Sequence, residues 1–194
     1  EQRGERRFSI EADAQTPLLH VAFHAGATND PETLPLGLLL AILAEGDSSR
    51  LHRALVEEDG LAISVSGHQS DGFDAGLAYF ALTLAPGADI AAAEARLRAE
   101  LERVATDGVS ASELAKARNL RLAAFWRGLQ TINGKASALG NFEVFRDDYE
   151  TLFDVPKQLN EITAAQLRAV AAEVFRDENM TVGILSAPAQ EEQE

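Results

Sequence analysis

Four histidines are the residues of this chain best suited to bind a transition metal or to carry a proton at neutral pH. His20 and His24 stand four residues apart, a spacing that on a helix can bring both imidazoles to one metal ion. The residues around them alternate between apolar and polar, however, which indicates a strand, and four residues of a strand span about 13 Å. Two ligands of one zinc ion must each lie about 2.0–2.1 Å from it. We therefore expect no shared metal at this pair, and we expect His52 and His68 to be solvated or loosely hydrogen-bonded.

Other residue patterns that carry chemistry are missing from the sequence. It contains neither HExxH nor HxxEH, no GxSxG elbow, no phosphate-binding loop and no GxGxxG. It has no cysteine, which excludes disulfides, thiolate metal sites and a cysteine nucleophile in this chain. The acidic run Glu57-Glu58-Asp59 is typical of a solvated helix end, and a contact with a cation or a basic peptide is the alternative. The residues alone therefore predict no active site.

Composition and charge narrow the class of protein. The chain has 194 residues, enough for one domain with a sizeable core, and its mean hydropathy is −0.11. Its 17 basic residues face 31 acidic ones, a net charge of −14, so we expect no nucleic-acid partner, which would need clustered Lys and Arg. No apolar run approaches the roughly 20 residues that span a bilayer, and the longest, 34–43, is interrupted by Pro35 and Gly37. We expect no membrane span.

The elements that must position these side chains follow from the spacing of apolar residues. Period-two alternation and turn residues predict strands, and period-3.6 stripes with capping residues predict helices. In the first half the expected elements are strands 8–12 and 17–27, a helix 32–44, a short helix that ends near 57, and strands 61–68 and 77–85.

In the second half Asp89 is expected to cap a helix that Gly108 ends, and Ser110 and Glu113 form a capping box that opens another long helix. The further expected elements are helices 134–143, 149–159 and 164–174 and a strand 180–185. We therefore predict one α+β domain over 1–194, a two-layer sandwich with a mixed or antiparallel sheet and helices on one face. Its last residues, 189–194, are expected to form a frayed acidic tail.

Three segments in order and spacing resemble the second domain of the M16, or pitrilysin-like, zinc metallopeptidases. They are Glu45-Gly46-Asp47-Ser48-Ser49-Arg50-Leu51, the helix end and strand from Leu55 to Val65 around Gly60-Leu61-Ala62, and a series from Phe125-Trp126-Arg127 through Gly134-Lys135-Ala136 to Leu152-Phe153. The resemblance covers about 7–188. It implies the M16 peptidase domain fold.

The resemblance also implies a division of labour. Family members pair two α+β domains around a chamber, and the first carries HxxEH and a distal Glu that hold zinc. The second closes the chamber and binds substrate. For this chain the resemblance implies no cofactor of its own, zinc in a companion domain or partner subunit, and no activity in isolation. The implied protein partner is an N-terminal M16 domain of the same parent chain, a homologous subunit, or both. The resemblance also implies a peptide substrate and a periplasmic location.

Two family positions depart from the pattern. The second domain normally supplies an Arg four residues before the glycine and a Tyr three residues after it, which steady the substrate carbonyl. This chain has Val56 and Ile63 there, and neither side chain can donate a hydrogen bond. Arg53, one helical turn before Val56, is the candidate for a partial replacement. The plainer interpretation is that Val56 and Ile63 are packing residues.

The turn residues Ser48, Ser49 and Arg50 are the remaining candidates for substrate contact, and helix capping and a surface charge are equally expected roles. Three functions remain open on the sequence. The first is the chamber-closing, substrate-binding half of a zinc metallopeptidase. The second is a catalytically silent homologue that acts as a structural or peptide-binding subunit, which the missing Arg and Tyr favour. The third is an α+β regulatory domain that senses a small ligand.

Overall fold

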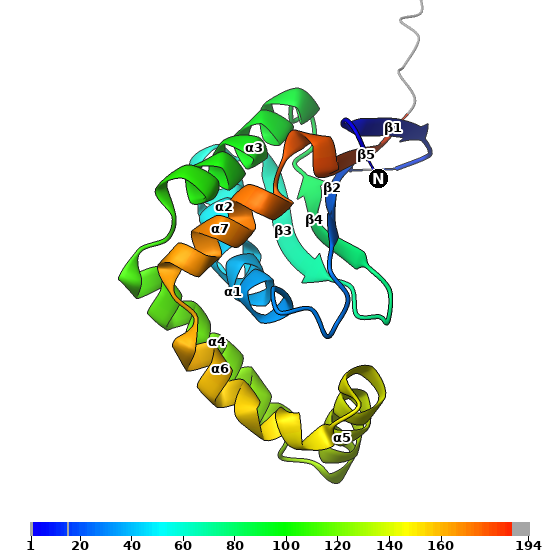
Figure 1. Cartoon of the computed structure of the whole chain (residues 1–194). Coiled ribbons are helices and arrows are strands. Elements are labelled where there is room, and N and C mark those ends of the chain that lie inside the picture. The colour runs from blue at the N-terminus through cyan, green and yellow to red at the C-terminus, as the bar shows by residue number, and fades with distance from the viewer. Residues whose placement is uncertain (1, 15, 188–194) are drawn as a thin grey trace, which may run out of the picture.

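Five strands form one mixed sheet in the order β1-β5-β2-β4-β3 in the computed structural model of the chain, which describes residues 2–14 and 16–187 (Figure 1). The strands are β1 (Arg6–Glu11), β2 (Leu18–Ala25), β3 (Ala62–Gln69), β4 (Gly76–Leu84) and β5 (Met180–Ser186). β1 runs parallel to β5, and all other neighbours are antiparallel. The predicted α+β class with a mixed sheet is confirmed, and the expected acidic tail at 189–194 lies outside the described residues.

Alternation along β2 separates the two faces of the sheet. Leu19, Val21 and Phe23 are at most 1% exposed and form the core face, while His20 and His24 are exposed on the opposite face. This is the pattern expected of a strand with one buried side, because successive side chains point to opposite faces.

Three helices cover the core face: α1 (Thr33–Ala44), α3 (Ile90–Asp107) and α7 (Ala164–Val174) (Figure 1). Asp89 caps α3 by accepting from the Ala91 N–H at 2.9 Å, as predicted, and Gly108 ends the helix with φ +76°. α1 is apolar all round because the sheet, α4 and α7 surround it. No described helix lies on the opposite face of the sheet, which we name the open face.

A tight turn with Gly46 at φ +78° leads from α1 into two short helical segments. These are α2 (Arg50–His52) and η1 (Arg53–Glu58), the latter a π-helical stretch. They connect α1 to β3, which lies at one edge of the sheet, with β1 at the other.

The other helical elements form an arm that extends from the two-layer core: α4 (Ala111–Gly128), α5 (Ile132–Arg146), η2 (Tyr149–Asp154) and α6 (Val155–Glu161) (Figure 1). A short η3 (Asp177–Asn179) precedes β5. The predicted capping box of Ser110 and Glu113 opens α4. Only Leu114 and Ala117 of α4 are fully buried, and Leu122 and Phe125 pack partly buried against the core.

The tip of the arm reaches back to the loops around the sheet. Phe145 packs on Phe73 with ring centroids 4.8 Å apart, and Arg146 donates from Nη2 to the Thr28 carbonyl at 3.2 Å. The turn between α4 and α5 depends on Gly134, since a Cβ there would collide with the Gly128 carbonyl oxygen. These contacts bend the arm into an arch beside α1.

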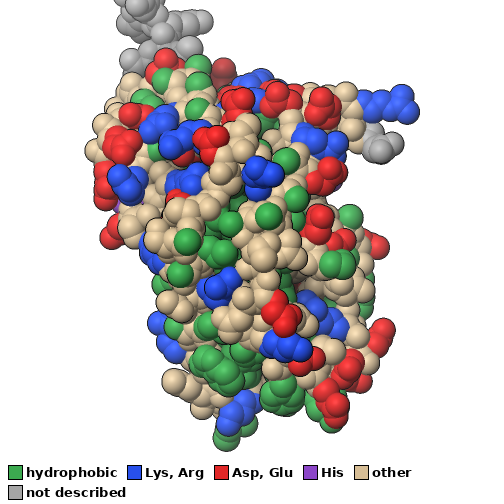
Figure 2. All heavy atoms as spheres, turned by 60° about the vertical axis from the view of Figure 1, so that its left-hand side comes forward, with side chains coloured by type: hydrophobic (Ala, Val, Ile, Leu, Met, Phe, Trp, Pro, Cys, Tyr) green, Lys and Arg blue, Asp and Glu red, His purple; other side chains and the backbone are tan. Residues whose placement is uncertain are grey.

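Hydrophobic side chains gather on the lower end of the molecule, where the arm lies (Figure 2). The large exposed members are Trp126, Ile132, Val144, Tyr149 and Phe153. Within the described parts of the chain, no helix combines the length and apolar composition that crossing a bilayer requires.

Candidate functional site

The turn after α1 places the two candidate serines in different surroundings. Ser49 is the N-cap residue of α2, is 2% exposed, and its Oγ has no hydrogen-bond partner among residues 2–14 and 16–187. Ser48 is exposed and its Oγ accepts from Lys116 Nζ of α4. Ser49 is therefore the N-cap residue of α2 by its backbone conformation, and its side chain makes no capping hydrogen bond. A substrate contact for either serine stays a prediction.

Arg50 forms a forked ion pair with Glu113 in the first turn of α4. Its Nε and Nη2 donate to the two carboxylate oxygens at 2.6 and 2.9 Å, and Nη2 also donates to the Gly108 carbonyl at 3.1 Å. The hydrogen bond from Arg50, helped by the Ser110 N–H, lowers the pKa of Glu113 from 4.5 to about 2, although burial of the carboxyl opposes the change. The ion pair therefore connects the start of α2 to the first turn of α4, and it leaves few Arg50 N–H donors for a substrate.

Arg53 and Arg50 share a cavity of about 370 Å³, the arginine cavity. It is lined by Arg50, Arg53, Ala54, Glu58, Arg96, Glu100, Arg103 and Glu113. Most of its charges cancel in pairs: Arg96 donates to Glu58, Asp59 and Glu100 at 2.8–3.0 Å. Arg53 is the exception, with a distance of 3.7 Å to Glu58 and 61% of its side chain exposed. It is the candidate guanidinium most accessible to a peptide.

Val56 and Ile63, the residues at the two departing positions, lie in contrasting places. Val56 is half-buried against the hydrophobic core, which agrees with a packing role. Ile63 is 54% exposed at the start of β3, where the pairing with β4 is irregular between Ala62 and Ser64. Neither supplies a donor to a substrate carbonyl.

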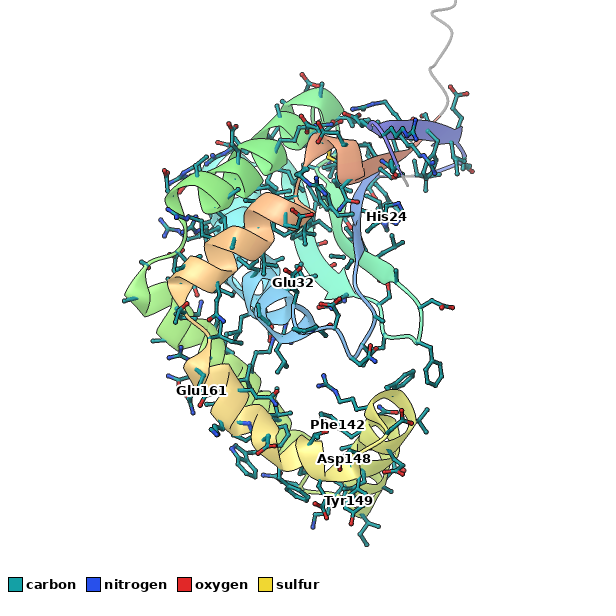
Figure 3. All side chains as sticks on the ribbon, in the orientation of Figure 1. His24, Glu32, Phe142, Asp148, Tyr149 and Glu161 are labelled. Atoms are coloured by element: carbon teal, nitrogen blue, oxygen red, sulfur yellow. The ribbon has the colours of Figure 1, made fainter. Side chains whose placement is uncertain are left out.

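The histidines do not fit a zinc ion. His24 Nε2 lies 3.2 Å from the Gln2 side-chain oxygen, on the side of the sheet away from the helices (Figure 3). His20 and His68 flank the ring of Tyr79 on the open face, and His52 lies in α2. No three His, Cys, Asp or Glu side chains of the described residues are grouped so that they could hold a metal ion.

The open face carries the feature that the sequence interpretation missed. It is hollowed by a largely apolar cavity of about 570 Å³, lined mainly by β1, β2, β4 and β5. Phe8 lies over Gly183 and is 53% exposed, and Leu77 is 41% exposed. The signal was available in the sequence, since Phe8, Ala22 and Leu77 occupy outward positions of alternating strands. Polar outward neighbours such as His20 and His24 obscured it.

A family model described as the peptidase M16 inactive domain matches residues 1–121. An uncharacterized zinc protease of Bacillus subtilis, YmxG, is 26% identical over 140 residues, which cover 71% of this chain and 33% of that protein. The chain thus spans about a third of the length of this curated relative.

Solved structures give the same fold. A protein of Bordetella pertussis named as a zinc protease is 31% identical, with a TM-score of 0.78 over 87% of this chain and 93% of that one. The inactive peptidase domain of a similarly named protein from Bordetella parapertussis is 29% identical, with a TM-score of 0.81 over 95% and 97% of the two chains. A protease from Helicobacter pylori matches in fold with a TM-score of 0.88 at 24% identity, over 95% of this chain and 45% of that one.

Proposed function

Because the chain belongs to the peptidase M16 family and matches its inactive domain, we propose that it is the non-catalytic half of a zinc peptidase. In this role it packs against a zinc-bearing companion domain, in the same parent chain or in a homologous subunit, and closes the chamber in which peptides are cut. The companion supplies the zinc chemistry, since the histidines and carboxylates described above do not fit the metal.

The observation that carries the proposal is the apolar open face. Sheets of soluble α+β proteins can leave one face to solvent, but that face is then mostly polar. Here Phe8, Leu77 and Tyr79 line a largely apolar hollow of about 570 Å³ on it. Large apolar patches rimmed by polar groups mark interaction surfaces. The 140 matched residues cover 33% of the relative, which leaves ample length in such a protein for a companion domain.

In the peptidase, the part of this chain is binding and enclosure. Val56 and Ile63 cannot steady an oxyanion, so donors for the transition state come from the companion. Arg53 is the side chain that we propose to contact the peptide, because its donors are the least occupied in the arginine cavity. Because this chain lacks the Arg and Tyr donors, it contributes to the rate of peptide cleavage by holding the substrate and by excluding water.

The experiment that tests the docking face measures the affinity of this chain for a separately purified companion domain that carries HxxEH. Leu77→Asp and Phe8→Asp each place a charge on the open face, and we expect each to weaken the association at least about tenfold, because an unpaired charge would be desolvated. Ile132→Asp on the arm is the matched control, since Ile132 is 89% exposed, lies at the start of α5 and does not line the hollow of the open face.

Far-ultraviolet circular dichroism would verify that each variant is folded. If Ile132→Asp abolished association and the two open-face variants bound normally, the arm would be the docking surface and the proposed face would be wrong. No association of the unsubstituted pair at about 100 μM would overturn the proposed assembly itself.

A further inference from the structure

A third cavity lies inside the arch of the arm, on the helical side of the molecule. This arm cavity has a volume of about 460 Å³, within the range of about 300–1,000 Å³ that is usual for small-molecule sites. Its walls come from α1, the end of β3, α4 and α6. It is distinct from the arginine cavity and from the hollow of the open face, which have other lining residues.

The lining of the arm cavity is partly apolar, and the cavity has room for a side chain. Its apolar lining includes Leu34, Leu38, Ala124, Phe125, Val155 and Leu159, and its polar lining consists of Thr33, His68, Gln69 and Arg121. Gly37 faces it from the middle of α1, and a Cβ built on Gly37 meets no atom within 4 Å. Glycine in a helix interior lowers stability by about 1 kcal/mol relative to alanine. Gly37 therefore destabilises α1 slightly and leaves an empty space where a side chain could lie.

Arg121 supplies the charged group of this cavity. It projects from α4, its Nη2 donates to the Gly37 carbonyl at 3.0 Å, and the same Nη2 lies 3.2 Å from Glu45 Oε2. Its Nε is buried and has no acceptor among the described residues, and its recorded hydrogen bonds there come from Nη2 alone. About 36% of the side chain is exposed, so a ligand can reach the guanidinium.

A guanidinium with unoccupied N–H donors beside a partly apolar hollow has a specific chemical complement. Arg binds planar carboxylates through two parallel hydrogen bonds, and such charge-assisted bonds are about twice as strong as neutral ones. The apolar walls favour an aliphatic or aromatic group attached close to that carboxylate. The C-terminal residue of a peptide combines both, with its side chain and its carboxylate on one carbon.

We propose that the arm cavity binds the C-terminal residue of a peptide, with an apolar side chain against Leu34, Leu38 and Phe125 and the α-carboxylate on Arg121. The proposal rests on the proposed function for its choice of a peptide, and it deepens that function by naming the part of the substrate or product that this half retains. The arm, whose tip is held against the loops around the sheet by Phe145 and Arg146, forms the roof of the site. Figure 3 shows Phe142 and Tyr149 on the same part of the arm.

The test measures binding of an N-terminally fluorescein-labelled hexapeptide that ends in Phe-Leu to the 194-residue chain by fluorescence anisotropy. One arm of the experiment uses the free acid and the other uses the same peptide with a C-terminal amide. We expect the free acid to bind saturably and the amide to bind at least about tenfold more weakly, because the amide cannot form the ion pair. Arg121→Gln should remove this difference between the two peptides.

A steric variant tests the hollow itself. Gly37→Leu places a side chain in the empty space and should weaken binding of the free acid at least about tenfold. Gly140→Leu is the matched control, because Gly140 also lies inside a helix, also meets no atom within 4 Å of a built Cβ, and lines none of the described cavities. It should bind the peptide as the unsubstituted chain does.

Absence of saturable binding up to about 1 mM would overturn the inference, as would equal affinity for acid and amide or unchanged binding by Gly37→Leu. These failures are separable from failure of the proposed function, which is measured through association with the companion domain at the open face. A chain that docks to the companion but binds neither peptide would keep the proposed function and lose the arm site.

Discussion

The forked ion pair of Arg50 and Glu113 ties the turn after α1 to the first turn of α4. The Glu113 carboxylate also accepts a hydrogen bond from the Ser110 N–H. The Glu113 side chain thus belongs both to the capping box of α4 and to the contact with Arg50, 63 positions away along the chain. Because the folded pKa of Glu113, about 2, lies below its ordinary value of 4.5, the ionised form stabilises the fold. This contribution is fully present above about pH 4.5 and is lost as the pH falls towards 2.

We therefore predict that Glu113→Gln lowers the free energy of unfolding by about 1–2 kcal/mol at pH 7, a value reduced from the full pKa change because 31% of the Glu113 side chain is exposed. Near pH 2 the variant and the unsubstituted chain should differ much less. Urea unfolding at both pH values measures this. Glu102→Gln, at an exposed position of α3, serves as control, and an equal loss for Glu113→Gln at the two pH values would contradict the electrostatic account.

Local residue signals were predictable and remote partners were not. Asp89, Ser110 and Glu113 act as caps because a cap needs only its own first helical turn. The partner of Arg50 could not be read from the sequence, since the fold alone brings α2 and α4 together. Whether Ser48, Ser49 and Arg53 contact a peptide stays a prediction.

Among the elements, the arm is where sequence and structure differ most. The capping box of Ser110 and Glu113 predicted where α4 begins, but it carries no information about which neighbour covers the helix. Beyond Ala117 no residue of α4 is fully buried, and α5 has no buried residue. The parallel pairing of β1 with β5 was equally beyond local patterns, because the two strands lie at opposite ends of the described chain.

We propose that the arm folds together with the core as one domain, since Leu114, Ala117 and Leu159 of its helices belong to the main hydrophobic cluster. The single tryptophan, Trp126, lies on the arm and is 57% exposed, which makes it a reporter of this element. We predict coincident thermal transitions by Trp126 fluorescence and by far-ultraviolet circular dichroism. A fluorescence transition several degrees lower would show that the arm unfolds by itself.

At the scale of the whole molecule, two layers leave the apolar open face of the sheet without a described helix (Figure 1). We propose that this face is where a domain with a complete core meets its companion domain. The family was predictable from short segments in the right order, and the family model and the Bordetella structures confirm it. The apolar hollow was not predicted, because it exists only when four strands lie side by side.

Zinc content is the measurement that tests the central claim most directly. Elemental mass spectrometry would be applied to this chain alone and to its purified complex with the HxxEH-bearing companion, both prepared with zinc in the buffer. The account predicts about one zinc ion per complex and far less than one per isolated chain, since a zinc site needs three or four grouped ligands that the described residues do not offer. A stoichiometric zinc ion on the isolated chain would contradict it. A complex without zinc would also contradict it and would favour a catalytically silent scaffold.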